Sequence, residues 1–137
     1  MVIIDTGPIV ALFDESEPLH GICKSTLKKI KVPLITSWPV LTESFYLLGG
    51  WHKGQKELWD FIFAGGLSIY DIPEADYGRL RALMEKYADK PMDLADASLV
   101  LISETKKIKT IFTLDKRDFS IYQPVHCKRL EIIPSKE

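Results

Sequence analysis

A short, wholly apolar segment that stops abruptly at an acidic residue is the feature that most constrains this fold. Residues 2–4 are Val-Ile-Ile, and the turn-forming cluster Asp-Thr-Gly-Pro follows at residues 5–8. A β-branched run of this kind, bounded by turn residues, is typical of a strand buried on both faces of a parallel sheet. The first residues therefore predict a sheet that helices cover on both sides.

Helical and strand patterns alternate along the rest of the chain. Helices are predicted at about residues 19–30, 37–48, 55–64, 74–87 and 93–107, and further strands at 34–36, 68–72, 110–114 and 130–133. Ser37 suits an N-cap, and the pairs Gly49-Gly50 and Gly65-Gly66 suit helix ends. This alternation predicts an α/β fold, a single three-layer domain with a mainly parallel central sheet flanked by helices. The spacing alone does not determine the strand order.

Length and composition narrow the class of protein. The 137 residues are enough for one compact domain spanning residues 1–137, and 46% apolar with 27% charged residues is typical of a soluble globular chain. No apolar run approaches a membrane span, and the amino terminus does not resemble a signal peptide. Cys23 and Cys127 stand apart from other metal-binding residues and are interpreted as reduced thiols of a cytoplasmic protein. The net charge of −1 provides no overall attraction to nucleic acid.

Four acidic residues occupy positions where a charge is hard to explain. Asp5 and Asp115 each follow a predicted strand at its carboxyl end, where ligands bind in open α/β sheets. Glu43 lies on a predicted helix, and its neighbours three and four residues away are mostly apolar. Asp96 has a similar surrounding, and it shares a helical face with Asp93 one turn earlier. If those faces are buried, the charges need a partner or a metal ion.

Each of these carboxylates also has a purely structural explanation. Asp93 and Asp96 fit an N-cap and an acidic third position of a helix. Asp115 and Asp118 fit Asx-turn or capping positions, and Asp5 fits the start of a turn. Glu43 would face water if the helix were rotated from the predicted phase. These explanations do not account for all four acids lying at strand ends or on apolar helical faces.

Carboxylates that are brought together repel one another unless they share protons or bind a cation. The set contains only oxygen ligands, with no nearby histidine or cysteine, so it suits Mg²⁺ or Mn²⁺ rather than Zn²⁺. A bound cation would reverse the sign of the local charge. The pattern therefore points to a site for a divalent cation.

At the level of motifs, the chain resembles the PIN-domain nucleases, particularly the toxin ribonucleases of prokaryotic toxin–antitoxin modules. The resemblance rests on four ordered segments that span residues 3 to 119. They are Ile-Ile-Asp-Thr-Gly-Pro-Ile-Val-Ala-Leu at 3–12, Thr-Ser-Trp-Pro-Val-Leu-Thr-Glu at 36–43, Met-Asp-Leu-Ala-Asp-Ala-Ser-Leu at 92–99, and Thr-Leu-Asp at 113–115 with Asp-Phe at 118–119.

The resemblance implies a metal-dependent endoribonuclease that cleaves RNA. Its catalytic acids would be Asp5, Glu43, Asp96 and Asp115, of which Asp5, Asp96 and Asp115 would hold Mg²⁺ or Mn²⁺. The supporting positions would be Thr6, Asp93, Thr113 and Asp118. Such proteins commonly form homodimers and are inhibited by a cognate antitoxin protein. A basic patch for RNA is expected at Lys106, Lys107, Lys109, Lys116 and Arg117, although ordinary surface charge explains these residues equally well.

Two other classes of protein share part of these features. The triplet Asp5-Thr6-Gly7 also occurs in aspartic proteases, but those folds are almost entirely strand, and the helical patterns here exclude them. A binding module remains as the alternative, either a catalytically inactive PIN-like domain or a receiver-like domain. A receiver requires a second acid in the first turn, which Thr6-Gly7-Pro8 does not provide. An inactive domain should lack one of the four acids, and none is missing.

Overall fold

The computed structural model describes residues 1–135 and contains a parallel sheet between two layers of helices. The strands are β1 (Val2–Ile4), β2 (Leu34–Ser37), β3 (Ser68–Tyr70), β4 (Thr110–Phe112) and β5 (Glu131–Ile133). The helices are α1 (Thr6–Phe13), α2 (His20–Lys29), α3 (Trp38–Leu47), α4 (Lys53–Phe63), the short 3₁₀ helix η1 (Glu74–Asp76), α5 (Tyr77–Lys86), α6 (Leu94–Lys106) and α7 (Lys116–Phe119).

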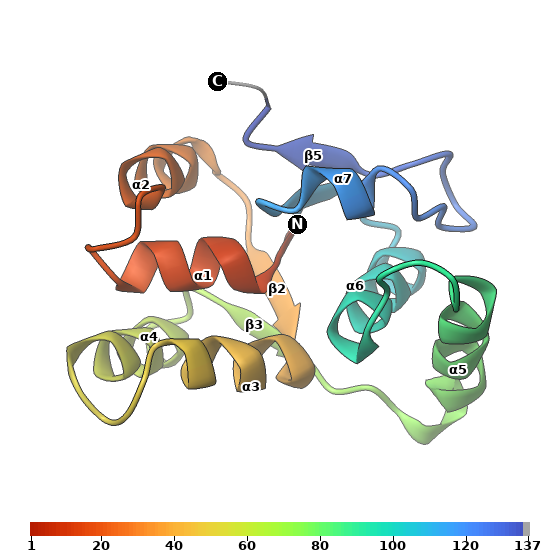
Figure 1. Ribbon diagram of the computed structural model, residues 1–137, viewed down its shortest axis with the longest axis horizontal. Coiled ribbons are helices and arrows are strands. Elements are labelled where there is room, and N and C mark those ends of the chain that lie inside the picture. Colours follow the sequence, from red (N-terminus) through yellow and green to blue (C-terminus); the bar gives the residue numbers. More distant parts are fainter. Residues whose placement is uncertain (136–137) are drawn as a thin grey trace.

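The strand order is β3-β2-β1-β4-β5, and every neighbouring pair is parallel. Helices α1 to α4 lie on one side of the sheet, and α5 and α6 lie on the other (Figure 1). The chain runs outward from β1 through β2 to β3 and then crosses back to β4. This reversal between β1 and β4 creates a crevice at the carboxyl ends of these two strands, which is where ligands bind in such sheets.

The central strand confirms the prediction from its apolar sequence. All three residues of β1 are buried, and Ile3 is completely inaccessible. A strand with neighbours on both sides and helices on both faces has no solvent-facing residue, so its sequence is continuously apolar. The charge at position 5 therefore comes directly after the most deeply buried part of the sheet.

The α/β class and the parallel sheet are confirmed, but two helices were not predicted, α1 and the four-residue α7. Residues 5–8 were interpreted as a turn, whereas Asp5 is the N-cap of α1 and Pro8 lies in its first turn. Proline is compatible with a first turn because the amide hydrogens there have no partner within the helix. Most residues of α1 are buried, since the helix packs against α2, α3 and α4, and it lacks the polar face that reveals a surface helix.

The predicted helix ends at glycine are confirmed. Gly49 and Gly65 follow α3 and α4 with φ angles of 83° and 84°. Glycine adopts this left-handed conformation without a steric penalty, so it ends helices efficiently. Within residues 1–135, no helix is long and apolar enough to cross a membrane.

Candidate active site

All four predicted acids line one cleft at the carboxyl edge of the sheet. The cleft has a volume of about 510 Å³. Its lining comprises Asp5, Thr6, Gly7, Glu43, Leu47, Pro91, Asp93, Asp96, Leu114, Asp115 and Asp118. Six of these residues are carboxylates, and no lysine, arginine or histidine of the described chain lines the cleft with them. The fold thus brings together acids that are separated by up to 113 residues in sequence.

Asp5 is the most buried of the six acids, with 8% of its surface exposed. Its Oδ1 accepts a hydrogen bond from the Thr6 amide at 2.7 Å, and its Oδ2 accepts one from the Thr113 hydroxyl at 2.7 Å. Burial raises the pKa of Asp5 to about 6, although these two hydrogen bonds oppose the shift. The charges of Asp115 and Glu43 add to the increase. Asp5 therefore carries its negative charge at neutral pH only at an energetic cost.

Glu43 is connected to the same place by a hydroxyl group. The Thr6 side chain donates a hydrogen bond of 2.8 Å to Glu43 Oε1, and this bond connects the first turn of α1 to the middle of α3. The apolar helical face around Glu43 is only partly buried, because Val40 is inaccessible whereas Tyr46 and Leu47 are 81% and 55% exposed, and Glu43 itself is exposed. Glu43 lines the cleft, so its charge is not a buried one that requires a partner.

Asp93 and Asp96 occupy the start of α6. Asp93 is the N-cap, and its Oδ1 accepts a hydrogen bond of 2.8 Å from the Asp96 amide, so the capping interpretation of Asp93 is confirmed. Asp96 is the acidic residue in the first turn of α6, as the same interpretation predicted, and it is half-buried on the cleft wall. Burial, together with the charges of Asp93 and Asp5, raises the pKa of Asp96 to about 7. A pKa this high means that the surroundings of Asp96 stabilise its negative charge less well than water does.

The fourth acid caps the short helix α7. Asp115 Oδ1 accepts a hydrogen bond of 3.2 Å from the Asp118 amide, and the Asp115 amide donates to the Thr113 hydroxyl at 3.0 Å. Asp115 itself is exposed. Burial and the adjacent Asp115 raise the pKa of Asp118. Thr113 therefore contacts two acids, since it donates to Asp5 and accepts from Asp115.

Sequence reasoning missed one residue of this site. Tyr122 is completely buried, and its hydroxyl donates a hydrogen bond of 2.9 Å to Asp96 Oδ2. Burial and the Asp96 charge raise the pKa of Tyr122, so the hydroxyl stays protonated and acts as the donor. Tyr122 lies after α7 in a segment without helical or strand periodicity, and the sequence carries no signal that it contacts residue 96.

The donor set fits a hard divalent cation, but the side chains do not form a closed ligand shell. The cleft contains carboxylate oxygens from four short stretches of chain, and it offers no nitrogen or sulfur ligand within residues 1–135. In the same residues, no three acidic, histidine or cysteine side chains are grouped closely enough to hold a metal ion. Hydrogen bonds from Thr113, Thr6 and Tyr122 hold three of the carboxylates against the walls of the cleft.

The basic residues expected to form one patch lie at two ends of the domain. Lys106 and Lys107 are at the end of α6, which is 13 residues long and starts at the cleft, so they lie roughly 20 Å from the acids. Lys109 precedes β4 at the opposite edge of the sheet. Only Lys116 and Arg117, at the start of α7, are next to the cleft.

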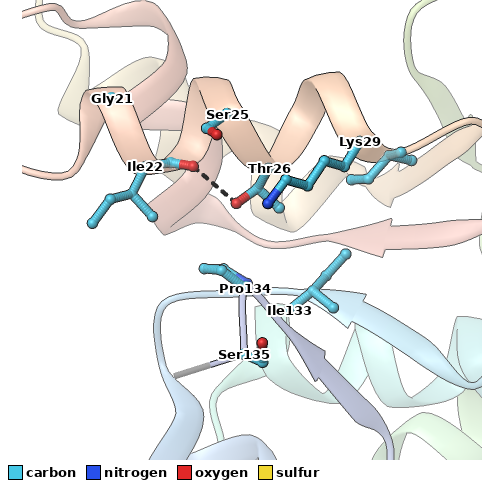
Figure 2. Close-up of a pocket in the computed structure, with 9 residues that line it drawn as sticks. Gly21, Ile22, Ser25, Thr26, Lys29, Ile133, Pro134 and Ser135 are labelled. Atoms are coloured by element: carbon cyan, nitrogen blue, oxygen red, sulfur yellow. Dashed lines mark hydrogen bonds between the residues drawn. The ribbon is translucent and has the colours of Figure 1, made fainter. Parts of the chain in front are cut away.

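A second hollow, of about 560 Å³, lies between α2 and the segment after β5 (Figure 2). Apolar and hydroxyl side chains form most of its wall, and Lys29 is the one charged residue that lines it among the described residues. It contains no acid, so it does not compete with the acidic cleft as a candidate for metal-dependent chemistry.

Comparisons with known proteins agree with this geometry. The family model of the PIN domain matches residues 2–123. Ribonuclease VapC26 of Mycobacterium tuberculosis is 29% identical over 135 residues, covering 97% of this chain and 100% of that protein. Among solved structures, the Mycobacterium tuberculosis toxin VapC20, described as cleaving the sarcin-ricin loop, superposes with a TM-score of 0.81 at 18% identity, over 93% of this chain and 99% of that one. A toxin–antitoxin complex from Klebsiella pneumoniae contains a chain with a TM-score of 0.68 at 18% identity, covering 88% of this chain and 91% of that one. The family match covers most of the sequence and includes all six acids of the cleft, and the chain therefore belongs to the PIN-domain family.

Proposed function

We propose that this protein is a metal-dependent endoribonuclease and the toxin of a toxin–antitoxin pair. The observation that carries the proposal is the cleft itself, in which six carboxylates meet without a basic side chain among the residues that line it. Two of these acids, Asp5 and Asp96, have pKa values raised to about 6 and about 7. Such a site lacks a positive charge, and a bound cation would supply it. The similarity to a protein named as a ribonuclease supports RNA as the substrate.

Asp5, Asp96 and Asp115 are the residues we propose to hold the metal ion, and Glu43 either binds it or orients the attacking water. Oxygen-only donors favour Mg²⁺ or Mn²⁺. When bound, the ion would polarise a phosphoryl oxygen and lower the pKa of a water molecule.

Two hydroxyl groups keep the acids in place for this role. Thr113 holds Asp5 Oδ2, and Thr6 holds Glu43 Oε1. Asp93 supports the site because it caps the start of α6, where Asp96 lies. Asp118 supports it because its amide donates a hydrogen bond to Asp115 Oδ1. Hydrogen bonds to a carboxylate restrict its rotation, so these contacts reduce the entropy that the acids lose when they bind a ligand.

The acidic cleft repels RNA unless cations compensate for its charge. Lys116 and Arg117 are the basic side chains closest in sequence to a cleft acid, since they follow Asp115 directly. We propose that they contact RNA phosphates on either side of the bond that is cleaved. A net charge of −1 for the chain makes this local positive charge more important.

The remaining parts of the proposal concern partners and location. The chain is proposed to act as a single nuclease domain in the cytoplasm, as a homodimer, under the control of a cognate antitoxin. The superposition on a chain of a toxin–antitoxin complex supports the antitoxin partner. Exposed aromatic residues support an interface, because Trp51, just before α4, and Phe63, the last residue of α4, are 69% and 79% exposed. Light scattering of the purified chain at high micromolar concentration should give the dimer mass, and a monomer mass would contradict that part.

RNA cleavage with and without metal tests the catalytic proposal. We expect the protein to cut RNA in Mg²⁺ or Mn²⁺ and to be inactive in EDTA. Asp96→Asn should abolish cleavage, whereas Asp71→Asn should retain it. Asp71 is a matched control because it also follows a strand, β3, but does not line the cleft.

Two results would reject this function. One is undiminished cleavage in EDTA, and the other is full activity of the Asp96→Asn variant. Absence of cleavage in every metal, combined with tight binding of RNA, would favour the inactive PIN-like binding module instead.

A further inference from the structure

The aromatic residue behind the acidic cleft contributes a single polar group to it. Tyr122 is fully buried, and its ring packs edge-on against Phe119 at 5.2 Å and against Tyr87 at 5.1 Å. Both of these neighbours are also buried. A tyrosine enclosed in this way has very little freedom to rotate, so the position of its hydroxyl is determined by the core rather than by solvent.

That hydroxyl acts on one oxygen of the Asp96 carboxylate. It donates to Oδ2 at 2.9 Å, so the buried tyrosine holds this oxygen on the core side. Asp96 also lines the cleft, so a ligand there would meet a carboxylate whose rotation the hydroxyl restricts. Without the tyrosine hydroxyl, the carboxylate could exchange its two oxygens by rotating about χ2, a torsion with a broad energy profile.

The same aromatic cluster supports a second acid of the cleft. Phe119 lies at the end of α7, and the N-cap of this four-residue helix is Asp115. Tyr87 fixes the segment that follows, because its hydroxyl accepts a hydrogen bond of 2.8 Å from the Gln123 amide. One rigid cluster thus determines the relative positions of Asp96, through a hydrogen bond, and Asp115, through the packing of its helix.

From this arrangement we infer that Tyr122 is a positioning residue of the metal site, which holds Oδ2 of Asp96 and so fixes the orientation of a carboxylate that would bind the cation. The inference rests on the proposed function, because it assumes that Asp96 binds the ion. It assigns a role to a residue outside the set of acids. Partners of metal ligands typically change metal affinity or activity by 10- to 100-fold when they are removed, because they orient the ligands.

The variant Tyr122→Phe tests this role because it keeps the ring and removes only the hydroxyl. We expect the dissociation constant for Mn²⁺, measured by calorimetric titration of the metal-free protein, to rise about 10-fold. RNA cleavage should require correspondingly more Mn²⁺ and should approach the parent kcat at saturating metal, with an unchanged KM for RNA. A purely structural role would lower the melting temperature and leave the Mn²⁺ dissociation constant unchanged.

Tyr87→Phe is the matched control. It removes a buried hydroxyl from the same cluster, but this hydroxyl contacts a backbone amide and no acid. Its melting temperature should fall while its Mn²⁺ dissociation constant stays within about twofold of the parent value. Comparing both variants at a temperature where circular dichroism shows each to be folded removes the contribution of stability.

The outcomes separate the inference from the proposed function. If the parent protein binds Mn²⁺ and cleaves RNA, but Tyr122→Phe binds Mn²⁺ as tightly as the parent or more tightly, the positioning role is overturned and the proposed function stands. An equal loss of affinity in Tyr87→Phe would also overturn it, because the effect would then come from the cluster as a whole. If the parent binds no Mn²⁺, both the function and the inference fail.

Discussion

Replacing Asp5 with asparagine should stabilise the metal-free protein at neutral pH, although it removes a residue of the proposed active site. Asp5 is buried, and its pKa is raised from 3.8 to about 6. A shift of about 2 pKa units corresponds to about 3 kcal/mol at about 1.4 kcal/mol per unit. Asparagine has the same shape and carries no charge, so it avoids this cost.

Two losses reduce the expected gain. Asparagine has one acceptor oxygen instead of two, so the hydrogen bond from either the Thr6 amide or the Thr113 hydroxyl is lost, at about 1 kcal/mol. The negative charge at the start of α1 is also removed, which costs roughly 0.3–1 kcal/mol. The net effect at pH 7.5 should therefore be a gain of about 1–2 kcal/mol in the free energy of unfolding.

The pH dependence provides the sharper test. Because the folded pKa of Asp5 lies above the unfolded value, its contribution to stability is fully present below pH 3.8 and is lost as pH rises to about 6 and beyond. At pH 4.5 the parent carboxyl group is mostly protonated in the folded state, so Asp5→Asn should be no more stable than the parent. The difference between the two proteins should then change sign between pH 4.5 and pH 7.5.

Urea melts in EDTA at these two pH values measure the effect, with Asp71→Asn as an exposed control that should show no such change. A variant that is less stable than the parent at both pH values, by the same amount, would refute the reasoning. That result would mean that Asp5 is a helix cap whose charge the fold tolerates without strain.

Three further predictions concern the Asp96 carboxyl group, the binding of Mg²⁺, and the ion pair between Arg79 and the buried Glu104. Asp96→Asn should raise the free energy of unfolding of the metal-free protein at pH 7.5 by about 0.5–2 kcal/mol in urea melts. This gain is smaller than the Asp96 pKa of about 7 would suggest, because solvent screens the partly exposed carboxyl group. A destabilised variant would count against strain at this acid. Mg²⁺ at 100 times its dissociation constant should stabilise the parent protein by about 2.7 kcal/mol. The melting temperature of the parent should therefore rise with Mg²⁺, and that of Asp96→Asn should not. Equal rises in both proteins would argue against binding at this site. Arg79→Ala should lower the free energy of unfolding by roughly 2–4 kcal/mol in a urea melt. The reason is that Glu104, which is 7% exposed, loses the side chain that donates to both of its carboxylate oxygens. A loss below about 0.5 kcal/mol would show that this ion pair does not contribute to stability.

Helix α1, which was not predicted, shows where reasoning from local sequence patterns fails. Residues 6–13 are almost entirely apolar because α1 is enclosed by three other helices, and a helix buried all round has no 3.6-residue alternation of polar and apolar positions. Glycine and proline at its start also favour a turn when the sequence is considered alone. The helices that keep one face in water, such as α4 and α5, were predicted to within a few residues.

The amino-acid sequence by itself determined the α/β class, most helices and strands, and the residue types that point to a metal-dependent nuclease. These features depend on short-range patterns, such as apolar runs, caps and acids placed directly after strands, which neighbouring residues specify. Only the tertiary structure decided the strand order, the gathering of the acids into one cleft and the burial of Asp5. It also decided that Glu43 is held by Thr6, and that Tyr122 reaches Asp96 across 26 residues. Contacts of this kind depend on how the helices pack against the sheet, and no local pattern records which side chains that packing brings together.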